Sequence, residues 1–374
     1  MIPYVLIRDT SLTAIGIIDT AKSVIWHSVY FGVGDFEIFA QATEQNLNLL
    51  KVGYYVARQD NDEIGVIEEI SVDFTPTDGY MISASGRFAK SILDRRLIYK
   101  LSGTVNTPTI LRGNVEQAAR LCVKNNAIDT TDANRKISVL GLAALNNIPA
   151  IIVDENGNPS QVQVSYQNLL DYTDGLLQEY GLGAKLIYND SNKKLLYSVY
   201  QGADRSTANT AGNDEIIFSI DYDNLNSSNY DYTPKNERTA ALIGGAGEGL
   251  ERFYSLLANA PTGLNRREIF VDASSVNKKY TDDQDVEHEY TDAEYTAMLN
   301  QQGKKTLSTH IARESFTGVL NATFGMWIYG RDYFLGDIVT IQDNKLGKYD
   351  SKRIIEVTEV QDDNGYNIDV VFGD

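Results

Sequence analysis

The chain has 374 residues, 43% hydrophobic and 22% charged, which is the composition of folded domains and too long for one core of ordinary size. Its formal net charge of −18 repels nucleic-acid phosphates, so stable binding to DNA or RNA is disfavoured. The single cysteine, Cys122, excludes an internal disulfide, and no stretch approaches the 18 apolar residues of a membrane-spanning helix.

Short runs that alternate apolar and polar residues fill the first 100 positions and predict an N-terminal β-barrel over residues 1–100. Residues 88–99 predict a helix, because Ile92, Leu93, Leu97 and Ile98 fall on one helical face. The predicted strands are 4–7, 12–19, 23–31, 34–40, 54–58, 63–74 and 80–86. The opening residues lack the apolar core of a signal peptide, so we expect the chain to fold in a cytoplasm.

Residues 101–213 mix helix and strand patterns and predict an α/β insert domain. Asn114 is a good N-cap for a helix that runs to about Asn125. A second helix is predicted from Tyr166 to Tyr180, started by Ser165 and ended by Gly181 or Gly183. The predicted strands are 136–142, 184–188 and 194–200, and the polar residues 202–213 predict a loop.

Residues 214–374 return to strand patterns and predict a second β-barrel domain with an inserted helix at about 291–310. Thr291 and Glu294 have the spacing of a capping box at the start of that helix. The last residues predict an antiparallel meander, with Asp343-Asn344 and Asp363-Asn364-Gly365 at its turns. Further strands are predicted at 215–221, 239–244, 252–258 and 268–272, with a charged, exposed loop at 278–290. The predicted fold class is therefore α+β, mainly β.

No group of residues has the pattern of an active site or a cofactor site. The glycine-rich segment 244–249 follows a predicted strand, but its last glycine comes one residue too early for a dinucleotide fingerprint. A strand is predicted next, so a bent strand edge is the better interpretation. The three histidines lie in separate segments, and the aspartates at 221, 223 and 231 do not have EF-hand spacing. We predict no catalytic residue, no metal and no cofactor.

Three blocks of sequence resemble, in the same order, the tail-hub or tail-associated protein family of long-tailed phages. In the first block, residues 86–98, a glycine-arginine pair leaves a strand and opens a helix that ends in two arginines. The second is the glycine-rich strand with its following arginine at 242–252, and the third is the terminal meander from 329. The family-motif and interface candidates are Gly86, Arg87, Asp94, Arg95, Arg96, Gly245, Gly247, Arg252, Gly330, Asp332, Gly336 and Asp337.

The resemblance implies a structural virion protein rather than an enzyme. Family members form a trimeric ring at the tail tip or baseplate, in which each subunit gives two tube-like barrels and three subunits match a sixfold tube. The implied partners are other copies of the chain, the distal tail or tail tube protein, the tape measure protein, and tail fibre, spike or receptor-binding proteins. DNA would only pass through, and this chain would not insert into a membrane.

The resemblance and the residues together leave two alternatives and three expectations. The alternatives are a receptor- or glycan-binding tail module and the hub of a contractile injection particle. The 23 tyrosines favour surfaces that are buried on assembly, and packing at the rim of barrel strands or a carbohydrate-binding platform are the other interpretations. We expect one of Arg87, Arg95 and Arg96 to pair with a carboxylate across a domain or subunit boundary. We expect the inner wall of the ring to be neutral to negative. Because the sequence ends at Asp374, directly after the meander, we expect no peptidoglycan-cutting activity.

Overall fold

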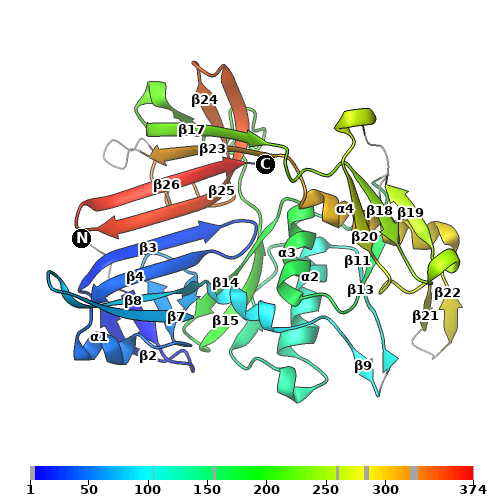
Figure 1. Cartoon of the computed structure of the whole chain (residues 1–374), viewed down its shortest axis with the longest axis horizontal. Helices are drawn as coiled ribbons and strands as arrows, with labels where there is room; N and C mark the ends of the chain where they lie inside the picture. The colour runs from blue at the N-terminus through cyan, green and yellow to red at the C-terminus, as the bar shows by residue number, and fades with distance from the viewer. Residues whose placement is uncertain are drawn as a thin grey trace.

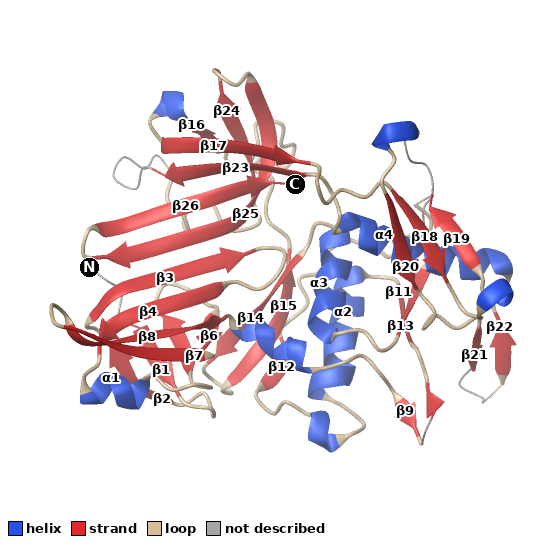
Figure 2. Ribbon diagram, viewed as in Figure 1, coloured by secondary structure: helices blue, strands red, loops and turns tan. Residues whose placement is uncertain are grey.

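The computed structural model describes residues 5–103, 105–154, 157–257, 261–281, 286–320 and 327–373. The chain is mostly β, and strands from both chain ends lie side by side in one large sheet (Figure 1). Most of the helices and several of the smaller sheets lie at the other end of the molecule (Figure 2). None of the described helices is long and apolar enough to cross a membrane.

The central sheet has ten strands and contains both chain ends. Its middle is the antiparallel pair β3–β25, in which Trp26 lies opposite Glu359 and His27 opposite Thr358. The strands in order are β17 (Leu225–Thr233), β23 (Arg313–Leu320), β26 (Gly365–Gly373), β25 (Lys348–Asp362), β3 (Ala21–Val29), β4 (Asp35–Gln41), β8 (Gly79–Arg87) and β7 (Glu69–Thr75), with β24 (Ile338–Asp343) on β25 and β16 (Ile217–Ser219) on β24.

The central sheet differs from the predicted pair of barrels, and it contains two strands that were not predicted. Among the described residues its strand order does not close, so the two predicted barrels are not confirmed, although the terminal meander β24–β25–β26 is. Strands β17 and β23 were not predicted from the sequence. Strand β17 is exposed over most of its length, so it lacks the alternation that marks a half-buried strand.

A four-stranded sheet packs against the N-terminal half of the central sheet and buries its core. Strand β4 alternates buried and exposed residues, and its buried Phe36 and Ile38 join Trp26 and Val56 in this core. The sheet has the order β2 (Ala14–Ile18), β1 (Val5–Arg8), β5 (Tyr55–Arg58) and β6 (Ile64–Val66), with helix α1 (Glu44–Leu49) beside it. The predicted strand 63–74 is therefore two strands, β6 and β7, in different sheets.

The segment after β8 is a 3₁₀ helix, η1 (Ala89–Arg95), and not the longer helix predicted for 88–99. Ile92, Leu93 and Ile98 are buried as expected, but the Leu97 side chain is 49% exposed. The backbone is extended from Arg96, and the Ile98 amide donates to the Gln167 carbonyl at 2.8 Å. This pairing with the insert replaces the last helical turns.

The insert packs two helices and short strands around a hydrophobic core that it shares with residues of the N-terminal part, such as Tyr55, Ile64 and Leu93. Asn114 caps α2 (Val115–Val123) as predicted, and Cys122 is buried in that helix. Helix α3 (Leu169–Glu179) begins later than predicted, because Asn168 and not Ser165 caps it, while Gly181 follows its end with φ +65°. The other elements are β9 (Leu101–Ser102), β10 (Val105–Asn106), β11 (Thr109–Arg112), η2 (Lys124–Ile128), η3 (Ala133–Arg135), β12 (Leu140–Leu142), β13 (Gln161–Val164), and the predicted hairpin β14 (Gly183–Asn189) and β15 (Lys194–Tyr200).

Residues 240–308 form a separate small module between β17 and β23, with its own hydrophobic core. The predicted capping box is present, since the Thr291 side chain accepts from the Glu294 amide and Glu294 accepts from Thr291. The predicted loop at 278–290 contains a two-stranded hairpin instead. The elements are η4 (Ile220–Tyr222) before the module, then β18 (Ala240–Gly244), η5 (Gly249–Glu251), β19 (Tyr254–Leu257), η6 (Gly263–Asn265), β20 (Glu268–Asp272), β21 (Lys279–Thr281), β22 (Glu287–Glu289) and α4 (Asp292–Ser308).

Candidate functional site

The central sheet has one face that no other layer of the described protein covers, which we call the open face. The open face extends across the sheet from β7 to β17. Residues opposite each other on neighbouring strands lie on the same face, for example Glu69 with Ser85 and Val319 with Ser227. Its residues include Ser23, Ile25, His27, Asp35, Glu37, Phe39, Glu69, Ser71, Asp73, Ser83, Ser85, Ser227, Asn229, Asp231, Thr317, Val319, Glu356, Thr358, Asn367 and Asp369, all of them exposed or half-buried. Seven of these twenty are carboxylates. The same registers also place Arg87 opposite Asp35 and the half-buried Val29, Val360 and Val371 on this face, so the open face is a mixed surface with an excess of carboxylates.

A buried ion pair joins the two chain ends under the central sheet. The Arg58 Nη2 atom of β5 lies 3.0 Å from Glu359 Oε1 of β25, and their side chains are 5% and 8% exposed. Arg58 also donates two hydrogen bonds to Asp60, at 2.9 and 2.6 Å, and the Tyr366 hydroxyl donates to Glu359 at 2.8 Å. Each buried charge is therefore neutralised, which a low-dielectric interior requires.

A second contact between the chain ends lies on the open face. The His27 ring is 3.1 Å from Asp35 and 3.4 Å from Glu356. Its hydrogen bond to Glu356 raises the pKa of His27 to about 9, with Asp35 adding to the effect, and the same bond lowers the pKa of Glu356. At neutral pH the imidazolium therefore sits between two carboxylates on neighbouring strands.

Replacing His27 with glutamine should make the protein less stable by about 1 kcal/mol, a small value because the pair is partly solvated. The pKa of His27 is raised on folding, so its stabilising effect is complete below its unfolded pKa of about 6.5 and is lost as the pH rises through about 9. Thermal unfolding of the wild-type and His27→Gln proteins from pH 6 to pH 10 measures this. A difference between the two proteins that persists unchanged at pH 10 would contradict the assignment.

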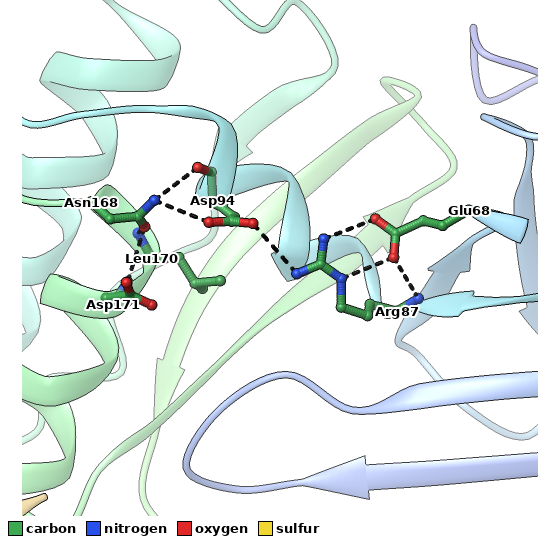
Figure 3. A network of polar contacts seen from close by, with 6 residues as sticks. All are labelled: Glu68, Arg87, Asp94, Asn168, Leu170 and Asp171. Carbon is green, nitrogen blue, oxygen red and sulfur yellow. Dashed lines mark hydrogen bonds and ion pairs between the residues drawn. The ribbon is translucent and has the colours of Figure 1, made fainter.

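The first motif block ties the N-terminal strands to the insert (Figure 3). Arg87 donates to both carboxylate oxygens of Glu68, at 2.9 and 3.0 Å, and lies 3.5 Å from Asp94. The Asp94 carboxylate and carbonyl both accept from Asn168, the N-cap of α3. Gly86 has no space for a side chain, since a Cβ there would lie 1.9 Å from the Val66 carbonyl oxygen. Arg87 thus lies in a chain of contacts that ends in the insert.

The other two arginines of this block behave differently from Arg87. The Arg96 Nε atom donates to the Arg135 carbonyl at 2.8 Å, so it reaches the insert, where it pairs with no carboxylate of the described residues. Within the described part of the chain, no ion pair of Arg95 is found. Arg87 pairs with Glu68 and Asp94, which both lie within residues 1–100. Pairing of Arg95 with a carboxylate of another subunit stays a prediction.

The second motif block folds the glycine-rich turn between β18 and β19. Arg252 donates to the carbonyls of Gly244 and Gly245, at 2.9 and 3.2 Å, and pairs with Asp272 at 2.5 Å. Gly247 has φ +96°, in the region that favours glycine. A strand follows the turn, as predicted from the sequence. The Arg252 side chain donates to the backbone carbonyls at the start of the turn. The turn is therefore a structural bend of the module.

The third motif block holds the C-terminal meander against the segment that follows β15. Asp337 is buried, and it accepts from the Ala203 amide at 2.7 Å and from Arg205 at 2.9 Å. Gly336 has φ +94° and lies against the Tyr30 ring. Asp332 accepts from the Ile328 amide at 2.7 Å, and Gly330, with φ +79°, lies in the same turn. The first and third blocks thus lie at contacts with or next to the insert, whereas the second lies in the module.

Sequence analysis named none of Arg58, Glu359, His27 and Glu356 as site residues. Arg58 and Glu359 are 301 residues apart in the sequence, and His27 and Glu356 are 329 apart. No local sequence pattern marks such pairs. Among the described residues no group of three or more histidine, cysteine, aspartate and glutamate side chains is placed to hold a metal ion. The contacts described above hold strands and domains together, and the open face adds a surface with an excess of carboxylates.

Comparison with known proteins gives one family and a set of similar structures. A family profile described as siphovirus ReqiPepy6 Gp37-like protein matches residues 4–374. The fold is similar to the tail protein of Neisseria meningitidis MC58, with a TM-score of 0.55, 13% identity, and 99% of this chain and 96% of that chain covered. It is also similar to the 43 kDa tail protein of prophage MuSo2 from Shewanella oneidensis, with a TM-score of 0.56, 12% identity, and 99% and 98% covered. Among curated proteins, none matches the sequence significantly.

Proposed function

This chain belongs to the siphovirus ReqiPepy6 Gp37-like protein family, and we propose that it is the hub of a phage tail tip. It is a structural protein of the tail. In the proposed hub, three copies form a ring that joins the tail tube or distal tail protein to the fibres, spike and tape measure protein. The proposed domains are 1–100, 101–213 and 214–374, and the hub has no catalytic role.

The observation that carries this proposal is the continuous central sheet. Its outermost strands, β7 and β17, each pair with one neighbour within the described chain, so both edges have backbone groups free to pair with another strand. Two edges at opposite ends of one sheet allow head-to-tail contacts between subunits. Such contacts close into a ring when the rotation from one subunit to the next is a whole fraction of a full turn. The N-terminal and C-terminal strands would then supply two repeating parts of the ring wall per subunit.

The open face is the proposed wall of the channel. A basic wall would hold DNA through phosphate contacts, whereas the acidic open face repels phosphate and lets DNA slide past. Its small serine, threonine and asparagine side chains keep the wall smooth. The net charge of −18 supports this role, as do the seven carboxylates among the residues of the open face given above.

The mass of the purified chain in solution, together with a low-resolution image, tests the proposal directly. We expect the mass of three chains and a ring with a central hole, whose obligate contacts bury well over roughly 2,000 Å² in total. The same protein should leave cell-wall substrate uncleaved. A stable monomer at high concentration without any partner would contradict the hub, and lysis of cell wall would reveal chemistry outside the proposal.

Removing two exposed aromatic rings from the sheet edge should weaken the ring. Phe74 of β7 and Tyr80 of β8 are 59% and 62% exposed, and their ring centroids are 4.8 Å apart. An apolar pair at a free edge gains most of its burial from a neighbouring subunit. We therefore expect Phe74→Ser with Tyr80→Ser to lower the mass from trimer to monomer, while the melting temperature of the subunit shifts little.

The matched control is Tyr166→Ser, because Tyr166 is 60% exposed but lies in the insert, away from both sheet edges. This variant should keep the trimer mass. Light scattering after size-exclusion chromatography measures all three proteins. A trimer that survives the Phe74 and Tyr80 substitutions would remove this edge from the proposed contact.

A further inference from the structure

A cavity of about 700 Å³ lies where the N-terminal strands, the insert and the C-terminal meander meet. Its size is that of a pocket for a small molecule or for a long side chain of a partner. The residues that carry the argument are Ser28, Asp60, Asp62, Glu63, Tyr200 and Tyr329. Phe334 also lines the cavity and is 45% exposed, so a ligand can enter from the solvent.

The Ser28 hydroxyl is a polar group that makes no hydrogen bond within the described part of the chain. Its side chain is 2% exposed and lines the cavity, and its Oγ atom has no hydrogen-bond partner among the described residues. A buried hydroxyl without a hydrogen-bond partner is unfavourable, because it has lost its contacts with water. A ligand in the cavity that accepts from this hydroxyl or donates to it would recover that loss.

Four carboxylates line the cavity, and three of them are paired with a lysine or an arginine. Asp60 is paired with Arg58 at 2.6 Å, Asp62 with Lys185 at 3.0 Å, and Asp337 with Arg205 at 2.9 Å. Glu63 lines the same cavity, and within the described residues its carboxylate makes no hydrogen bond or ion pair. A half-buried carboxylate that makes no direct ion pair favours a cation as its partner.

Aromatic rings complete a site for a cation. Tyr200 and Tyr329 line the cavity, and the ring of Tyr200 already faces an ammonium group, since Lys185 Nζ lies 5.2 Å from its centroid. Aromatic faces attract organic cations, and most strongly where water is displaced. We infer that this cavity, which we call the junction pocket, binds an alkylammonium or guanidinium group through Glu63, Ser28 and these rings.

The inference predicts a pH dependence with a definite sign. Burial raises the pKa of Glu63 to about 7, so deprotonation near neutral pH creates the charge that the cation binds. The groups whose charges act on Glu63 are Lys185 of β14, Lys90 of η1 and Asp62, and the neutral hydroxyls of Tyr200 and Tyr329 lie nearby. From pH 6 to pH 8 the ionised fraction of Glu63 rises from about 0.09 to about 0.91, so affinity should rise about tenfold.

Calorimetric titration of the full chain tests the inference with n-butylammonium, and with n-butanol as its uncharged match. We expect butylammonium to bind at least about tenfold more tightly than butanol, as a charge-assisted contact requires. Glu63→Gln should abolish both this preference and the pH dependence. The control Glu37→Gln removes a carboxylate from the open face and should change neither. Equal binding of butylammonium and butanol to the wild-type protein would overturn the inference.

Ser28→Ala gives a readout that does not depend on how well Glu63→Gln folds. Because the hydroxyl has no hydrogen-bond partner among the described residues, its removal should leave the melting temperature unchanged or raised, while butylammonium affinity falls about threefold. Unchanged affinity would remove Ser28 from the site. Two further probes separate the natural sources: tighter binding of Nα-acetyl-lysine methylamide indicates a partner side chain, and tighter binding of putrescine indicates a free diamine.

Discussion

Replacing Arg58 with methionine should lower the free energy of unfolding by about 3–5 kcal/mol, because it leaves the buried Glu359 carboxylate without its counter-charge. The Tyr366 hydroxyl would be the remaining partner among the contacts described for Glu359. Methionine fills a similar volume, so the loss reports mainly the charge. Trp26 lies 5.6 Å from the Arg58 guanidinium, so its fluorescence follows unfolding at this point.

A second substitution separates the ion pair from the fold around it. Adding Glu359→Gln to Arg58→Met removes the orphaned charge, and Tyr366 can still donate to the new amide, so at least half of the lost stability should return. The surface control is Arg331→Met, whose partner is Asp332 and whose side chain is 64% exposed, and it should cost less than about 1 kcal/mol. Urea unfolding measures all four proteins. If the double variant is less stable than Arg58→Met, the buried charge does not explain the effect.

Replacing Gly86 with alanine should destabilise the protein by at least about 3 kcal/mol or prevent soluble expression. The added Cβ would lie 1.9 Å from the Val66 carbonyl oxygen and 2.8 Å from the Glu68 amide nitrogen. Both are backbone atoms, which cannot rotate away, so β8 would have to separate from the β6–β7 segment. The shift would also displace the neighbouring Arg87 from Glu68.

Gly141→Ala is the matched control, since a Cβ there meets only the far end of the Leu196 side chain, at 2.9 Å. That side chain can move, so we expect a cost of about 1 kcal/mol or less. Soluble yield and thermal unfolding of the two variants give the comparison. A Gly86→Ala protein that melts like Gly141→Ala would show that the two segments separate easily.

Much of the strand content could be predicted because its signal is local. In β4 the buried Phe36, Ile38 and Ala40 alternate with exposed residues, so the sequence alone marks the strand. In β17 both faces are largely exposed, so polar residues follow one another and no period appears. The start of α3 depended on a distant contact. Ser165 and Asn168 can both cap a helix, but the Tyr166 amide donates to the Ile98 carbonyl, and Tyr166 has φ +61°, outside the region of a right-handed helix.

The joining of the chain ends could not be predicted, for a physical reason. Sequence patterns show which residues face a core, but they do not show which strand lies next to which. The alternation in β3 and β25 is compatible with two separate barrels or with one shared sheet. The choice rests on contacts such as Arg58 with Glu359, between residues that look like ordinary surface charges when the sequence is read alone.

The pairing of β3 with β25 also bears on how the protein is made. A ribosome completes β3 more than 300 residues before it releases β25, because the paired residues Val29 and Glu356 are 327 positions apart. Until then the newly made N-terminal sheet has an unpaired edge along β3, which invites pairing between nascent chains on neighbouring ribosomes. Closing so long a loop also makes this step slow. Chaperone dependence and loss of yield at high expression rates are therefore expected consequences of this topology.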